Sequence, residues 1–200
     1  TMKEEKKICH YLDLPIQHAS DRVLKRMGRR TTKQELIDII GKLREAMPDI
    51  FLRTSLISGF PGETQEDHEE LMRFVDEIEF DRLGVFTYSA EEDTPAATMD
   101  DQIPEELKEA RRDEIMELQQ EISLEKGENR IGQVMTVMIE GKVSGESAYI
   151  GRTYGDAPKV DGYIFVQTGE LLMTGDFARV RVTGALEYDL IGELEDEYTE

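Results

Sequence analysis

Tryptophan is absent from this 200-residue sequence, and Cys9 is its only cysteine. A single thiol cannot form a disulfide within the chain, which excludes a disulfide-stapled scaffold and fits a reducing compartment. No segment approaches the ~18 consecutive apolar residues of a membrane span, and residues 1–7 lack the apolar core of a signal peptide. We therefore expect a cytoplasmic protein, without a membrane partner, that is stabilised by its apolar core.

Basic residues are also scarce. The chain has 24 Lys and Arg against 44 Asp and Glu, a formal net charge of −20. Residues 131–200 alone hold 5 basic and 13 acidic residues, so the acidity extends over both halves of the chain. Such a surface repels phosphate backbones, which makes nucleic acid an unlikely main partner and favours a basic protein. Solubility explains the same acidity equally well.

Residues 1–130 alternate strand and helix patterns. Apolar segments at 8–17, 51–58 and 83–88 predict three strands, the second apolar enough for a buried parallel sheet. Helix patterns separate them, opened by Thr32 in a capping box and by Thr64, and a long helix is expected over 104–128. This order predicts an α/β fold with a parallel sheet and right-handed crossovers.

The pattern changes after Arg130. Short strand candidates separated by glycine or aspartate turns lie at 133–139, 148–150, 163–166, 177–183 and 190–194. Five short strands in 70 residues predict a small all-β barrel of the OB-like type. We therefore expect two domains, 1–130 and 131–200, and expect residues 193–200 to fray.

A glycine-rich corner follows the second strand, in the segment LRTSLISGFPGET at 52–64. A strand-to-helix corner of this kind can offer backbone N–H groups and a helix N-terminus to a ligand. An ordinary turn between a strand and a helix, shaped by Gly59 and Gly62, is the alternative.

Polar clusters follow all three predicted strands, at 14–18, 58–63 and 87–95. Ligands of parallel α/β sheets bind where the carboxyl ends of the strands meet, so we expect these clusters to converge. His18 either binds a ligand or satisfies its own loop, whereas His10 and His68 are expected at the surface. The three histidines and Cys9 have no metal-ligand spacing. The sequence Gly28-Arg-Arg30 either holds an anion or is a solvated helix end.

Taken together, these segments resemble the methylthiotransferase branch of the radical SAM enzymes. The resemblance rests on LDLPIQHASD at 12–21, on the segment 52–64 and on FTYSAEEDTPA at 86–96, and the C-terminal barrel resembles a TRAM domain. It implies a partial (β/α) TIM-like barrel, the second half of a radical SAM domain, followed by the TRAM barrel. It also implies S-adenosyl-L-methionine (SAM) as cofactor, and two 4Fe-4S clusters in the intact enzyme.

Within this branch, Gln17-His-Ala-Ser20 and the loop 151–162 are similar to the subfamily that methylthiolates an aspartate of a small-subunit ribosomal protein. A subfamily that modifies tRNA is the alternative, and a non-catalytic acidic binding module is a second one. The resemblance implies SAM contacts at Gln17, Arg53, Ser58, Gly59, Phe60, Gly62 and Tyr88. It implies substrate contacts at His18, Arg152, Asp156 and Asp161, although an Arg–Asp bridge that pins the loop would explain the last three as well.

One departure from the family pattern decides what this chain can do alone. The family holds its SAM-cleaving cluster with a Cys-x-x-x-Cys-x-x-Cys motif, and this chain has only Cys9. A four-iron cluster needs several thiolates. We therefore expect no metal site and no catalytic residue in this chain, which would be an inactive part of a longer enzyme.

Overall fold

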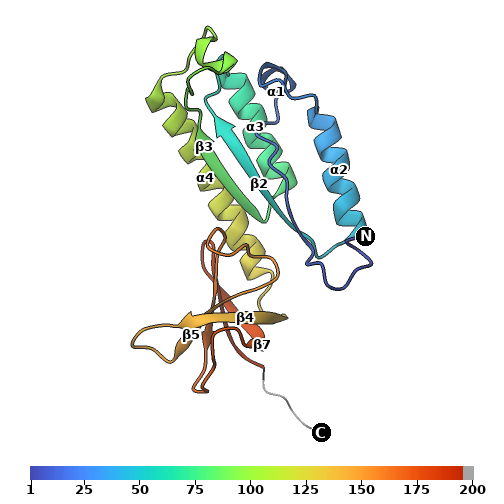
Figure 1. Cartoon of the computed structure of the whole chain (residues 1–200), viewed down its shortest axis with the longest axis vertical. Helices are drawn as coiled ribbons and strands as arrows, with labels where there is room; N and C mark the ends of the chain where they lie inside the picture. The colour runs from blue at the N-terminus through green and yellow to red at the C-terminus, as the bar shows by residue number, and fades with distance from the viewer. Residues whose placement is uncertain (196–200) are drawn as a thin grey trace. The chain divides into compact units, whose positions relative to one another are not determined.

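The computed structural model describes residues 1–195 (Figure 1). Its compact units are Leu12–Ile122 and a second unit that joins Thr1–Tyr11 to Ser123 and the residues after it. The predicted boundary near residue 130 stays a prediction. The elements are β1 (Tyr11–Asp13), α1 (Asp21–Arg26), α2 (Lys33–Ala46), β2 (Phe51–Ser58), α3 (Gln65–Ile78), β3 (Arg82–Thr87), a 3-10 turn (Pro95–Thr98), α4 (Glu105–Glu128), β4 (Val134–Lys142), β5 (Ala148–Arg152), β6 (Ile164–Gln167), β7 (Phe177–Ala185) and β8 (Leu190–Leu194).

The first half contains a three-stranded sheet in the order β1–β2–β3, with β2 and β3 parallel. This confirms the predicted alternation of strands and helices. Burial alternates along β2: Leu52, Thr54, Leu56 and Ser58 are buried, whereas the residues of the other face from Arg53 onwards are partly exposed. One face of the sheet is therefore buried along β2, and the other face is partly exposed to solvent.

The first strand is shorter than predicted. The sequence pattern indicated a strand over 8–17, but only Tyr11–Asp13 is a strand, and Gln17 returns to the sheet through an isolated bridge to Leu56. Pro15 has no N–H to donate to a neighbouring strand, and Gln17 has a φ of 71°, in the left-handed region that breaks an extended chain.

Both predicted helix caps are present. Thr32 opens α2 and Thr64 opens α3, each in a capping box whose N3 carboxylate returns to the cap backbone. The long helix α4 ends where predicted, but its buried face agrees only in part with the apolar face that periodicity predicts, which is Leu107, Ala110, Ile115, Leu118 and Ile122. The side chains of α4 that are nine-tenths or more buried are Lys108, Arg111, Ile115, Gln119, Ile122 and Ser123. A lysine and an arginine therefore occupy positions where periodicity predicts apolar residues.

The C-terminal strands form a closed barrel in the order β4–β5–β6–β8–β7, as predicted. Its core consists of Val137, Ile139, Tyr149, Ile164, Val166, Val180, Val182 and Leu190. The strand registers give the barrel two distinct ends. The linker end carries the loops 153–163 and 186–189 and contacts the last turn of α4, where Gly127 lies against Ala185 and Leu190. The distal end carries the loops 143–147 and 168–176.

Candidate cofactor and substrate site

The three polar clusters converge at the carboxyl end of β2. The N–H of Gln17 donates to the carbonyl of Ser55 at 3.0 Å, and the N–H of Tyr88 donates to the carbonyl of Ser58 at 2.8 Å. Gly59 continues directly from Ser58. Gln17, Gly59 and Tyr88 therefore lie at one edge of the sheet, as the strand pattern predicted.

Phe60 and Tyr88 form the apolar part of this edge. Their ring centroids are 5.2 Å apart in an edge-to-face arrangement, and both pack with Val23. Tyr88 is 8% exposed, and its hydroxyl has no hydrogen-bond partner among residues 1–195. Buried hydroxyls are normally paired, so this oxygen is suited to bind a ligand that lies against the two rings.

The glycine corner corrects one expectation. Its backbone N–H groups are not offered to a ligand, because the carboxylate of Glu63 already accepts from Gly59 at 2.8 Å and from Phe60 at 3.3 Å. The N–H groups of Gly62 and Glu63 donate to backbone carbonyls. The corner binds an anion, as its shape suggested, but the anion is the protein's own side chain.

Glu63 is the centre of a buried charge network. Its Oε1 accepts from the guanidinium of Arg111 at 2.9 Å, and its Oε2 lies 3.5 Å from Nε2 of His18. Burial alone would raise the pKa of Glu63, but His18, Arg111 and the N–H of Gly59 outweigh it and hold the pKa of Glu63 below its usual value. The carboxylate therefore stays charged although its side chain is completely buried.

His18 belongs to this network. It is fully buried, and its Nδ1 accepts the N–H of Ser20 at 2.9 Å. Because Nδ1 accepts, the ring proton lies on Nε2, which faces Glu63. Nδ1 of His18 therefore satisfies its own loop, whereas Nε2 forms no hydrogen bond with the described residues. A substrate contact at His18 remains an untested prediction. His68, expected at the surface, is 1% exposed and lies 2.7 Å from Glu114, because that side of α3 is covered.

Two further residues predicted to contact SAM point elsewhere. The hydroxyl of Ser58 is buried and donates to the carbonyl of Lys108 at 3.1 Å. Arg53 lies six residues before Gly59, roughly 20 Å along an extended strand, and its guanidinium pairs with Asp13 at 2.6 Å. Arg53 is therefore not gathered with the strand ends, and its assignment rests on the resemblance alone.

The charged residues of the barrel loop make contacts within the chain, and their predicted contact with a substrate stays a prediction. Asp156 is 6% exposed and accepts from the N–H and the hydroxyl of Thr153, so it closes its own turn. Asp161 accepts from the N–H of Ala157 and from the hydroxyl of Tyr11. Arg152 pairs with Glu140 at 2.7 Å.

Sequence reasoning missed Lys108 and Arg111, and treated Glu63 only as the residue after a turn. The Nζ of Lys108 donates to the carbonyl of Tyr88 at 2.9 Å and lies 5.5 Å from the centroid of that ring. The available signal was the i, i+3 spacing of these two cations in an acidic helix. An i, i+3 pair of cations is common on solvated helices, so it did not indicate burial.

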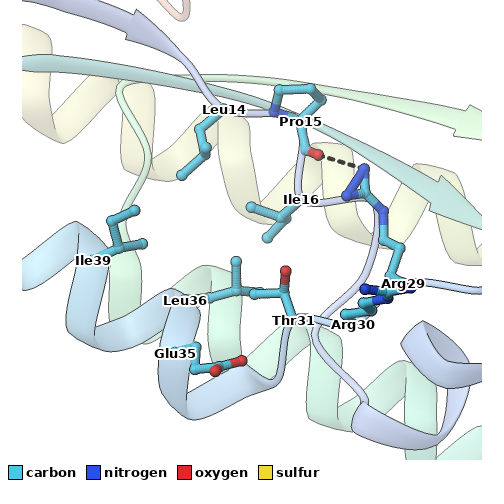
Figure 2. Close-up of a pocket in the computed structure, with 9 residues that line it drawn as sticks. All are labelled: Leu14, Pro15, Ile16, Arg29, Arg30, Thr31, Glu35, Leu36 and Ile39. Carbon is cyan, nitrogen blue, oxygen red and sulfur yellow. Dashed lines mark hydrogen bonds between the residues drawn. The ribbon is translucent and has the colours of Figure 1, made fainter.

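The basic sequence Gly28-Arg-Arg30 borders a hollow of about 430 Å³ (Figure 2). Leu14 and Ile16 face Leu36 and Ile39 of α2 across it, and the guanidinium of Arg29 donates to the carbonyl of Pro15 at 2.9 Å. None of the residues predicted to contact SAM lines this hollow.

The described residues do not fit an iron–sulfur cluster. Residues 1–195 contain no group of three or more Cys, His, Asp or Glu side chains placed to hold a metal ion. The one cysteine, Cys9, is exposed. In the same range, no helix is long and apolar enough to cross a membrane.

Comparisons with known proteins match both halves of the chain. The radical SAM superfamily model matches residues 1–75, and the TRAM domain model matches residues 131–194. A solved structure described as "Coproporphyrinogen III oxidase (HemN) from Escherichia coli is a Radical SAM enzyme" has a TM-score of 0.50 with this chain at 16% identity. The match covers 86% of this chain and 41% of that one. The fold is therefore that of part of a radical SAM domain followed by a TRAM barrel.

Curated relatives indicate which branch of the radical SAM enzymes the chain resembles. A protein of Lachnoclostridium phytofermentans named "Ribosomal protein uS12 methylthiotransferase RimO" is 62% identical over 97% of this chain, which covers 44% of that relative. The protein of the same name from Pelotomaculum thermopropionicum is 54% identical over 96% of this chain, again covering 44% of the relative. The chain belongs to the RimO-type radical SAM methylthiotransferases, and it spans less than half of the length of these relatives.

Proposed function

We propose that this chain is the part of a ribosomal-protein methylthiotransferase that forms one wall of the SAM site and carries the TRAM domain. The observation that carries the proposal is the 62% identity to a named uS12 methylthiotransferase over nearly the whole chain. The proposed reaction places a methylthio group on an aspartate of the small-subunit protein uS12, in the cytoplasm. The net charge of −20 supports a basic protein as substrate over tRNA.

The role proposed for this chain is to bind and orient SAM. Phe60 and Tyr88 offer an apolar wall, the unpaired hydroxyl of Tyr88 offers one hydrogen bond, and Gln17 adjoins them at the sheet edge. In the longer relatives, SAM and the clusters supply the radical chemistry. Because the described residues do not fit a cluster, this chain alone is proposed to be catalytically inactive.

A chimaera tests the function. The part of the Lachnoclostridium relative that precedes the matched region would be joined to residues 1–200, reconstituted anaerobically with iron and sulfide, and incubated with uS12, SAM and a reductant. We expect mass spectrometry of the uS12 peptides to show a methylthio group on one aspartate. A chimaera with intact clusters that modifies tRNA and leaves uS12 unchanged would replace this function with that of the tRNA-modifying subfamily.

A further inference from the structure

The distal end of the barrel exposes an unusual amount of apolar surface. Leu171 is 85% exposed, Met173 is 68% exposed and Phe177 is 72% exposed, all within seven residues. We call these three side chains the apolar tip. Exposed large apolar side chains grouped in one short segment are typical of interaction sites, and the sequence interpretation assigned no role to them.

The loop that carries the apolar tip is held in place by hydrogen bonds. The hydroxyl of Tyr149 donates to the carbonyl of Glu170 and accepts the N–H of Leu172, while Leu172 packs against the barrel core. Thr174 donates to the carbonyl of Glu140, and Gly175 to that of Ile139. The exposed side chains therefore project from an ordered loop. Because the loop is already ordered, it loses little conformational entropy when a partner binds.

Acidic side chains outnumber the basic Lys142, whose Nζ lies 5.9 Å from the centroid of the Tyr149 ring, at this end of the barrel. Glu170 and Asp176 belong to the same loop, and Glu146 lies in the neighbouring hairpin at the same end of the barrel. Charged residues around an apolar centre are the usual anatomy of a docking surface. Their sign favours a cationic partner, as does the net −8 of residues 131–200.

The apolar tip also lies at the opposite end of the barrel from the loop first expected to face the substrate. That loop, 153–163, lies at the linker end, where Asp156 and Asp161 are used to hold the loop itself. The distal end is the end that does not contact the last turn of α4, which lies against Ala185 and Leu190.

We infer that the distal end of the barrel is a docking surface for a basic protein, with the apolar tip as its centre and the acidic side chains as its rim. This inference rests on the proposed function for the identity of the partner, and it moves the contact surface from Arg152, Asp156 and Asp161 to the other end of the barrel.

The test measures the affinity of the 200-residue chain for purified uS12 at low and at physiological salt. Replacing the centre with serines (Met173→Ser with Phe177→Ser) should weaken binding by about tenfold or more, as expected when central apolar contacts are removed. Val160→Ser with Leu186→Ser removes two exposed apolar residues at the linker end and should change the affinity less than about twofold. Far-UV circular dichroism and melting curves check that both variants stay folded.

A charge-reversal pair tests the rim separately. Glu170→Lys should weaken binding more at low salt than at high salt, whereas Glu187→Lys makes the same change in net charge at the linker end and should have a smaller effect. Equal effects of Glu170→Lys and Glu187→Lys on the affinity would show that only the net charge of the chain matters. That result would contradict the assignment of Glu170 to the rim of the docking surface.

The remaining outcomes separate the inference from the proposed function. Wild-type binding to uS12 that the serine pair leaves unchanged overturns the docking surface and leaves the proposed function standing. No binding by the wild-type chain overturns the docking surface, while the chimaera still decides the function. Self-association of the wild-type chain that the serine pair abolishes, without a change in uS12 affinity, would assign the apolar tip to contacts between copies.

Discussion

At the residue scale, the most informative atom is the hydroxyl oxygen of Tyr88. A buried hydroxyl without a partner destabilises the folded chain by about 1–3 kcal/mol, and none of the described residues pairs with this one. A ligand that forms a hydrogen bond with this hydroxyl would remove that cost. This is why we place a ligand contact at Tyr88, whereas Ser58 is already engaged in the protein's own hydrogen bonds.

The substitution Tyr88→Phe separates stability from binding. It keeps the ring that packs on Phe60 and removes the unpaired hydroxyl, so we expect the melting temperature to stay equal or to rise. If the hydroxyl binds SAM, calorimetric titration should show affinity reduced by about five- to tenfold, the loss of one hydrogen bond. Lower stability with unchanged SAM affinity would show that the hydroxyl serves the fold instead.

Glu63 gives the second prediction at this scale. Glu63→Gln leaves Arg111 buried without its counter-charge and should lower the free energy of unfolding by about 2–4 kcal/mol in urea titrations. Glu66→Gln, on the exposed first turn of the same helix, is the control. The double change Glu63→Gln with Arg111→Met should recover part of the loss, because it removes both charges and keeps a side-chain oxygen for the N–H groups of Gly59 and Phe60.

The pH dependence follows from the lowered pKa of Glu63. A carboxyl group whose pKa is lower in the folded state stabilises the fold above the unfolded pKa, near 4.5, and this contribution is lost as the pH falls through the folded pKa. The wild-type chain should therefore lose stability more steeply below pH 4.5 than Glu63→Gln does. Parallel acid limbs in the two proteins would contradict the assignment.

At the element scale, the strands and the helix caps could be predicted because they depend on local patterns. The run of apolar residues at 51–58 and the capping box at Thr32 are read from a few neighbouring residues, and both are present in the structure. The extent of β1 was overestimated, because Pro15 has no N–H for the strand ladder and because the positive φ of Gln17 is not indicated by its residue type.

The glycine corner shows what local patterns miss. The glycines correctly indicated a turn, but the use of its N–H groups depends on Glu63, which in turn is neutralised by a cation 48 residues further along the chain. The buried face of α4 was misread for the same reason. Lys108 and Arg111 are buried because they meet carbonyl and carboxylate oxygens there, and sequence periodicity does not report such partners.

The corner itself is tested by a matched pair of glycines. Gly28 and Gly59 both have a φ of 74°, but a Cβ on Gly28 would meet nothing within 4 Å, whereas a Cβ on Gly59 would lie 2.2 Å from Cγ of Lys108. Gly28→Ala should cost about 1–2 kcal/mol, the left-handed backbone strain alone. Gly59→Ala should cost a further 1–3 kcal/mol, about the penalty for overpacking, measured by urea unfolding. Equal losses would show that α4 moves away without cost.

At the scale of the whole molecule, the residues that build the fold are not the kind of residues that would hold an iron–sulfur cluster. The sheet, its helices and the closed barrel require only apolar burial and hydrogen bonds supplied by residues 1–195. A four-iron cluster requires cysteine thiolates, and the 200 residues contain one. The resemblance to radical SAM enzymes predicted the fold correctly, because the fold depends on the distributed pattern and not on the cysteines.

Because the fold does not depend on the cluster cysteines, we expect the folded chain to bind no iron–sulfur cluster, and bound iron can be measured directly. After anaerobic incubation with iron and sulfide and removal of unbound iron, the 200-residue chain should retain far less than four iron atoms per molecule and show no cluster absorption. The chimaera described above should acquire both. SAM should still protect the strand ends of the 200-residue chain from hydrogen exchange, with Phe60 and Tyr88 in the protected region, since binding to a folded site slows local opening. Stoichiometric iron in the chain alone would mean that a second molecule contributes ligands, because one exposed cysteine leaves three of the four irons without a protein thiolate.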